Sequence, residues 1–145
     1  MAGFTELIKE RQGLAALNTG LLNVSVNGST NSGTLDMSLF NRGQFIVGVG
    51  SGGTGNAYLK QCANANGTGA TNLQMSPQNA AALTANTLVT LECRSDQMTA
   101  RYLLVQIVTD LAAQAFAIGE GFDRRYAPTT PADNASVLTR LVCNL

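Results

Sequence analysis

The chain of 145 residues contains no histidine and no tryptophan, and only 12% of its residues are charged. Without histidine it lacks the side chain that most often serves as a general base or a metal ligand near neutral pH. Nine basic residues balance nine acidic ones, so we expect no electrostatic attraction to nucleic acid or to an anionic membrane. Neither nucleic acid nor a membrane is therefore predicted as a partner.

Cysteine is also scarce, and the apolar runs are short. The three cysteines, Cys62, Cys93 and Cys143, form no C-x-x-C pair. An odd number of this kind fits reduced thiols made in a cytoplasm better than a disulfide framework or a metal site. No stretch approaches the roughly 18 apolar residues of a membrane-spanning helix, and the N-terminus lacks the pattern of a secretory signal. The length and composition predict one folded domain.

The glycine-rich stretch GVGSGGTGNA, residues 48–57, has the G-x-G-x-x-G outline of a dinucleotide-binding loop. Such a loop needs a helix directly after it and an acidic residue about 20 positions further on. Residues 57–62 alternate like a strand instead, and no Asp or Glu occurs between Asp36 and Glu92. The sequence therefore predicts a hairpin loop between two strands, and we expect no cofactor.

Most of the remaining chain shows the two-residue alternation of β-strands. Strands are predicted at residues 21–26, 44–50, 57–62, 88–94, 101–109 and 114–118, with a turn at 27–30 and one helical turn at 76–83. An amphipathic helix is predicted over residues 4–17. Short strands between Gly/Asn turns indicate a mainly β fold, an antiparallel β-sandwich of the jelly-roll type with a short N-terminal helix. The expected organisation is a helical arm at 1–20, a β-sandwich domain at 21–128 and a C-terminal extension at 129–145.

Few groups could carry out catalysis. Glu92 and Asp96 lie four residues apart, and Asp123 precedes two arginines, but no G-x-S-x-G motif is present. The plainer interpretation puts Glu92 on the solvent face of a strand and Asp96 in a turn, and pairs Asp123 with a neighbouring arginine. We predict no catalytic residue, no metal site and no enzymatic activity.

Seven segments of the chain occur in an order and spacing that resembles the capsid decoration proteins of tailed bacteriophages, also called cement or head-stabilising proteins. These segments are residues 35–42, 45–50, 57–61, 66–70, 89–98, 101–106 and 123–128. The resemblance implies a structural virion protein that binds the outside of a capsid shell and stabilises contacts between major capsid subunits. It also implies self-association as a dimer or trimer, a jelly-roll-like fold without enzymatic activity, and synthesis in the cytoplasm of a bacterial host.

Arginine and aromatic side chains are enriched at protein interfaces, and this guides the choice of interface residues. The predicted interface residues are Phe4, Leu7, Ile8, Arg11, Arg42, Arg124, Arg125 and Tyr126. In the alternative, the terminal segments cap the sandwich of their own subunit. Two other functions stay open, a carbohydrate-binding jelly-roll module and a tail or neck component of the virion. The absence of tryptophan speaks against the first, because sugar faces usually stack on aromatic rings.

Overall fold

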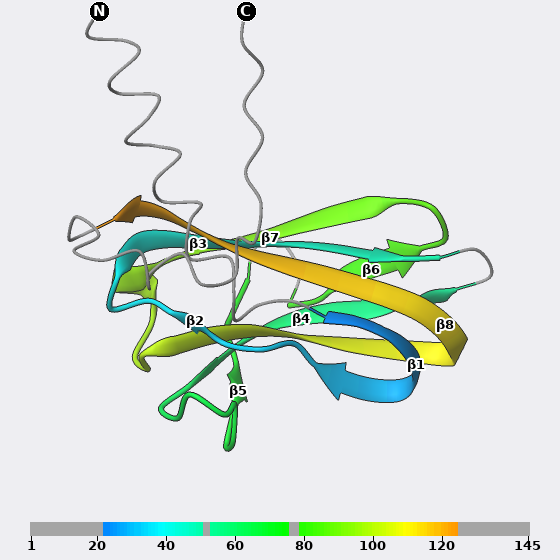
Figure 1. Ribbon diagram of the computed structural model, residues 1–145, viewed down its shortest axis with the longest axis horizontal. Coiled ribbons are helices and arrows are strands. Elements are labelled where there is room, and N and C mark those ends of the chain that lie inside the picture. Colours follow the sequence, from blue (N-terminus) through cyan, green and yellow to red (C-terminus); the bar gives the residue numbers. More distant parts are fainter. Residues whose placement is uncertain (1–21, 51–52, 76–78, 125–145) are drawn as a thin grey trace, which may run out of the picture.

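The computed structural model describes residues 22–50, 53–75 and 79–124, and they form one antiparallel sheet (Figure 1). Its elements are β1 (Leu22–Asn31), β2 (Leu35–Asp36), β3 (Phe40–Val49), β4 (Thr54–Cys62), β5 (Thr71–Asn72), β6 (Ala81–Thr84), β7 (Leu88–Arg94), a 3-10 turn at Ser95–Gln97 and β8 (Tyr102–Arg124). The predicted mainly β, antiparallel fold is confirmed. The helix expected at residues 4–17 lies outside the described residues.

The long strand β8 is the centre of the sheet. One of its edges pairs with β1 and β2, and its other edge pairs with β4 along residues 102–109 and with β3 along residues 115–124. Beyond these strands, β7 pairs with β3, while β5 and β6 pair with β4. The sheet therefore consists of four rows of strands, here called ribbons, and each row runs antiparallel to the next. Their order is β1–β2, β8, β3–β4 and β5–β6–β7.

At one level of the sheet, here called the crease, β8 bends as a continuous strand, and the strands beside it show a register shift or a break. In β1 the register shifts between Val26 and Gly28, where Gly28 has a φ of 97°. The extra residues at this shift are 110–112 of β8, which oppose Asn27 alone, and next to them the glycine-rich segment joins β3 to β4. In the fourth ribbon Asn86, with a φ of 62°, donates its backbone N–H to the Val49 carbonyl at 3.1 Å. β8 bends back at this level, so the single sheet folds into two layers (Figure 1).

The glycine-rich segment connects two strands that lie end to end. β3 and β4 both run antiparallel to β8 and do not pair with each other. The pairs Val49–Ala115 and Gly55–Thr109 are six residues apart on both strands, so the register continues unchanged across the segment. The predicted hairpin is therefore wrong, whereas the predicted strand after the glycines is confirmed. The segment carries the chain across the crease from one layer to the other.

The core lies between the two layers. Phe45 and Val47 of β3 and Leu103, Val105 and Ile107 of β8 have no exposed surface. Burial of each such side chain stabilises the fold by about 1.5–3 kcal/mol relative to exposure. The predicted alternation of β3 and β7 is confirmed, because their inward positions are the buried ones.

Three sequence predictions are corrected by the pairing of strands. The helical turn expected at residues 76–83 is strand β6 over Ala81–Thr84, because pairing with β4 and burial of Leu83 outweigh the helix propensity of alanine. The residues expected to turn at 27–30 continue strand β1 past a bulge in β8, and Gly28 supplies the positive φ there. The two strands expected at 101–109 and 114–118 are one strand, β8, because β1 bridges the bend between them.

Candidate functional site

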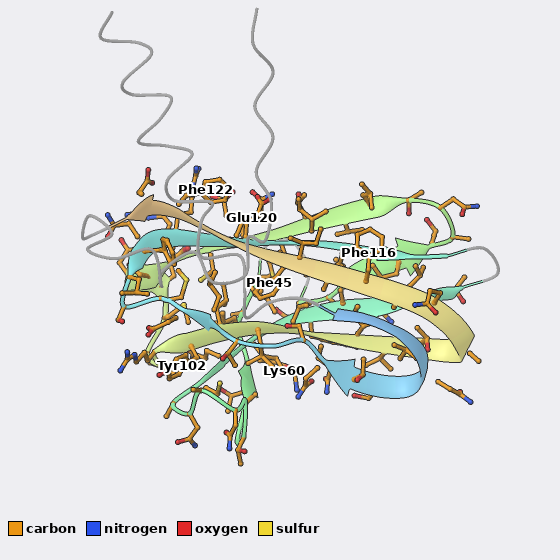
Figure 2. The ribbon with its side chains drawn as sticks, viewed as in Figure 1. Phe45, Lys60, Tyr102, Phe116, Glu120 and Phe122 are labelled. Carbon is orange, nitrogen blue, oxygen red and sulfur yellow. The ribbon has the colours of Figure 1, made fainter. Side chains whose placement is uncertain are left out.

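The two outer faces of the folded sheet differ in chemistry. The layer that contains β3, β7 and the second half of β8 (the β3 layer) carries large apolar side chains on its outside. These five residues, Ile46, Leu88, Phe116, Ile118 and Phe122, are here called the apolar face. Leu88 is 65% exposed and is the one exposed large hydrophobic residue in the described part of the chain. Figure 2 shows Phe116 and Phe122 on the outer side of β8, with Phe45 between the layers.

The opposite layer, with β4 and the first half of β8, has a polar outer face. Asn31, Gln106 and Tyr58 occupy one row across its strands, and Ser29 and Asn56 flank Val108 in the next. Lys60 and Tyr102 also project on this side (Figure 2). A sheet face in contact with water is normally polar, so the apolar face of the β3 layer is the unusual one and is typical of a contact surface.

Two carboxylates project from the same outer face, because Glu92 of β7 and Glu120 of β8 both pair with Gln44 of β3. Glu120 lies between Ile118 and Phe122 on the same face of β8, and it stands opposite Gln44 of β3. Burial raises the pKa of Glu120, and none of the described residues provides it with a hydrogen bond or an ion pair. A carboxylate in this setting is stabilised by a cation placed next to it.

At one end of the β3 layer the apolar face adjoins a charged hollow of about 480 Å³, here called the charged end. Its lining residues are Asn41, Arg42, Arg94, Ser95, Asp96 and Asp123. The guanidinium of Arg42 stacks over the Phe122 ring at 4.8 Å, and its Nη1 lies 3.6 Å from Glu92 Oε1. The buried Nε of Arg42 has no acceptor among the described residues. The stacked ring therefore holds an arginine whose hydrogen-bonding capacity is not fully used.

Of the predicted interface residues, the structure places Arg42 at the charged end. Phe40 pairs with Arg124, so the backbone of Arg124 lies at the same end of the sheet. The predictions for the other six concern residues outside the described part: Phe4, Leu7, Ile8, Arg11, Arg125 and Tyr126. Sequence reasoning missed Leu88, Phe116 and Phe122. A signal for Phe116 and Phe122 exists, because both sets of alternating positions in AFAIGEGF of β8 are apolar apart from Glu120, which indicates a strand contacted on both faces.

A bidentate ion pair fastens β2 to β8 away from the apolar face. Arg101 donates from Nε and Nη2 to Asp36 at 3.0 and 2.7 Å, and Ser38 donates its hydroxyl and backbone N–H to the same carboxylate. Burial alone would raise the pKa of Asp36, but these hydrogen bonds together lower it. The pair stabilises the connection between the first ribbon and the centre of the sheet.

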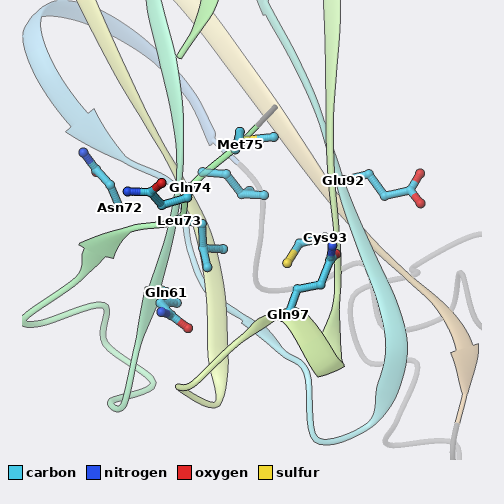
Figure 3. Close-up of a pocket in the computed structure, with 9 residues that line it drawn as sticks. Gln61, Asn72, Leu73, Gln74, Met75, Glu92, Cys93 and Gln97 are labelled. Carbon is cyan, nitrogen blue, oxygen red and sulfur yellow. The ribbon is translucent and has the colours of Figure 1, made fainter. Parts of the chain in front are cut away.

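A second hollow, of about 430 Å³, opens between the two layers (Figure 3). Its lining residues are Leu59, Gln61, Asn72, Leu73, Gln74, Met75, Glu92, Cys93 and Gln97, none of them aromatic. Glu92 points away from the other side chains in Figure 3, and Gln61 is occupied by hydrogen bonds to Thr99 and Ala100. The described residues contain no group of three or more potential metal ligands. This hollow therefore offers neither a sugar-stacking surface nor a projecting carboxylate.

The chain matches no family model and no curated protein. No helix in the described ranges is both long and apolar enough to span a membrane. Among solved structures it is similar to a chain of infectious bursal disease virus, Gx strain, with 13% identity over 77% of this chain and 32% of that one, at a TM-score of 0.33. A chain of the T13 particle of the same virus gives 13% identity, 74% and 29% coverage and a TM-score of 0.35. The chain thus spans less than a third of the length of these proteins, and at these TM-scores the likeness carries no argument about function.

Proposed function

We propose that this chain is a non-enzymatic structural protein of a virion, which binds the outside of a phage capsid shell and stabilises contacts between major capsid subunits. The proposal combines the sequence resemblance to capsid decoration proteins with one structural observation. That observation is the charged end, where Arg42 is held on Phe122 beside the half-buried apolar face. The proposal includes self-association as a dimer or trimer, and no nucleic acid or membrane as a partner.

The charged end has the chemistry of a protein-binding surface. Arginine stacked on an aromatic ring loses little side-chain freedom when it binds, so more of its interaction energy appears as affinity. Arg42 and Arg94 are both exposed enough to exchange their present carboxylate partners, Glu92 and Asp96, for an acceptor on a shell protein. Asp96 and Asp123 line the same hollow and can select against an acidic neighbour.

The test mixes the full-length protein with expanded capsid shells of the virus that encodes it, and measures co-sedimentation and the melting temperature of the shells. We expect binding and a higher shell melting temperature. Arg42→Ala should weaken binding about 30-fold, the effect of a central interface residue worth about 2 kcal/mol. Lys60→Ala, on the polar face, is the matched control and should bind like the unchanged protein.

Failure to bind any shell would refute the proposal. Labelling the protein in intact particles and locating it by microscopy distinguishes a shell protein from a tail or neck component. Clear hits on a glycan array would favour the carbohydrate-binding alternative instead.

A further inference from the structure

Strand β7 forms an open edge of the sheet. Among the described strands it pairs with β3 on one side, and none of them pairs with its other side. Natural sheets usually protect such an edge with a bulge, a proline or a lysine, or by keeping the strand very short. β7 has none of these features, because its seven residues read LVTLECR and its register with β3 is unbroken from Leu88 to Arg94. The opposite edge, β1, is less regular, since its register shifts at Gly28.

The backbone groups that point outward from β7 belong to alternate residues. In an antiparallel pair each residue points its N–H and its C=O together, either toward the partner strand or away from it. Arg94 donates its N–H to Gln97 Oε1 at 2.9 Å, so it points away from β3. Val49 of β3 points toward the β7 side, because its carbonyl accepts the N–H of Asn86. Both bonds give the same alternation. The outward-pointing residues of β7 are therefore Leu88, Thr90, Glu92 and Arg94.

The chain itself closes this open edge at both ends. At one end Gln97 holds the N–H of Arg94, and the carbonyl of Arg94 accepts the thiol of Cys93 at 3.3 Å. At the other end Asn86, with a φ of 62°, takes the backbone out of the strand direction. Between these limits, three residues have outward backbone groups with no partner in the described part of the chain. Thr90 is the middle one of the three.

The middle position of Thr90 makes the edge complementary to a second copy of the chain, the partner. In an antiparallel pair centred on Thr90, Leu88 stands opposite the partner's Glu92, and all three outward residues exchange both backbone hydrogen bonds. A pair centred on Glu92 would set two carboxylates against each other, which is unfavourable. A pair centred on Leu91 would need the N–H of Arg94, which a side chain already occupies. Hydrogen bonding and charge therefore select the same register.

We propose that two copies of this chain pair through β7, antiparallel and centred on Thr90, so that their β3 layers join into one sheet. The side chain of Leu88 is 65% exposed in the single chain. In the dimer it lies against the aliphatic stems of the partner's Glu92 and the partner's Arg94. The ion pairs that Arg42 and Asp96 make with Glu92 and Arg94 stay within each chain.

The dimer presents two charged ends on one side. The twofold axis is perpendicular to the joined sheet, so the outer faces of both β3 layers point the same way. Arg42 is opposite Arg94, four residues from the centre at Thr90, so the two charged ends lie about 27 Å apart along the strands. One dimer can therefore contact two capsid subunits at once. This use of the dimer rests on the proposed function, whereas the pairing itself does not.

Cysteine cross-linking of the full-length protein, without any shell, tests the register. All variants carry Cys143→Ser, and Cys62 and Cys93 are buried. Thr90→Cys should form a disulfide-linked dimer under mild oxidation, because Cα atoms of residues in a hydrogen-bonded pair are about 5.5 Å apart, within disulfide range. Mass spectrometry identifies the linked residue. Glu92→Cys, which is also exposed, is the matched control. It should link at least about ten times more slowly, because its two copies lie about 14 Å apart.

Sedimentation at a series of protein concentrations measures the dimer itself. Thr90→Pro should raise the dissociation constant about 30-fold, because both hydrogen bonds at the centre use the N–H of Thr90. That N–H has no partner within the described chain, so the proline should leave the fold intact, which circular dichroism verifies. Thr90→Lys should also weaken the dimer, because it sets two cations against each other. Thr90→Ser is the control and should dimerise like the unchanged protein.

Three results would overturn the proposal. They are a monomer at every concentration, a trimer, and faster linking through Glu92→Cys than through Thr90→Cys. A monomer whose binding to shells is lost in Thr90→Pro would assign the edge to a shell protein instead. Dimerisation and shell binding are measured separately, so a dimer that binds no shell would refute the proposed function and leave the pairing in place.

Discussion

Replacing Gly55 by alanine should destabilise the fold strongly, whereas the same change at Gly50 should not. The two glycines flank the crease in one segment, and neither has a positive φ. A Cβ on Gly55 would overlap the backbone carbonyl oxygen of Val108 and lie 3.0 Å from the Cα of Thr109. A Cβ on Gly50 would meet Gln114 at 3.5 Å, an ordinary van der Waals distance.

The loss of stability in Gly55→Ala depends on which atoms must move to make room for the Cβ. The obstruction at Gly55 is backbone of β8, so relief requires β4 and β8 to separate along their ladder. Overpacking of this kind costs about 1–3 kcal/mol, and each strained or lost ladder hydrogen bond adds about 0.5–1.5 kcal/mol. We expect a loss of about 2–4 kcal/mol for Gly55→Ala, which lowers the melting temperature by about 7–18 °C in a domain of this size. Gly50→Ala should be neutral, or stabilising by up to about 1 kcal/mol through the unfolded state.

Urea unfolding followed by circular dichroism measures both variants against the unchanged protein. Equal unfolding midpoints for the two alanine variants would refute the reasoning, because the difference between them depends on the close approach of Gly55 to the backbone of Val108.

Other consequences concern the core, an ion pair and the thiols. Phe45→Ala removes a fully buried ring and should cost about 3–5 kcal/mol in urea unfolding; a loss under 1 kcal/mol would contradict its place in the core. The lowered pKa of Asp36 stabilises the fold above the unfolded value of 3.8, and this stability is lost as the pH falls through the folded pKa. In the Asp36→Asn variant the free energy of unfolding should therefore fall less steeply as the pH is lowered into the acid range. An unchanged fall would count against the ion pair between Asp36 and Arg101. Burial raises the pKa of Cys62 and Cys93, so both should react with a thiol reagent more slowly than an exposed cysteine, and Cys62, which does not line the hollow between the layers, should react more slowly than Cys93. Fast labelling of Cys62 in the native protein would argue against its burial.

The strands that the sequence predicts well are those with one buried face. In β3, Phe45, Val47 and Val49 alternate with more exposed neighbours, and local pattern alone identifies the strand. β6 could not be found in this way, because Ala81 and Ala82 favour a helix in isolation and become a strand through pairing with β4. The secondary structure of residues 81–84 is therefore determined by pairing with a distant strand, which a local sequence pattern does not contain.

The crease and the site depend on contacts between distant segments. Gly28 and Asn86 each look like an ordinary turn signal, and their alignment emerges when β8 sets the register of its neighbours. Arg42 was predicted from residue type, but its contact with Phe122 follows from the pairing of β3 with β8. Glu120 looks like any surface acid until the strands place it among apolar side chains.

The central place of β8 determines the order in which the sheet can be completed. During synthesis from the N-terminus, the ribbons β1–β2 and β3–β4 leave the ribosome before the strand that lies between them. The pairs of β3 with β7 and of β4 with β6 can form early, whereas a pair such as Leu22–Ala117 must close a loop of most of the domain. Long-range pairing of this kind is typical of slow folding and of transiently exposed strand edges. The last of the described strands joins the two halves of the sheet, so a chain that ends before β8 leaves β1 and β2 without the strand with which both pair.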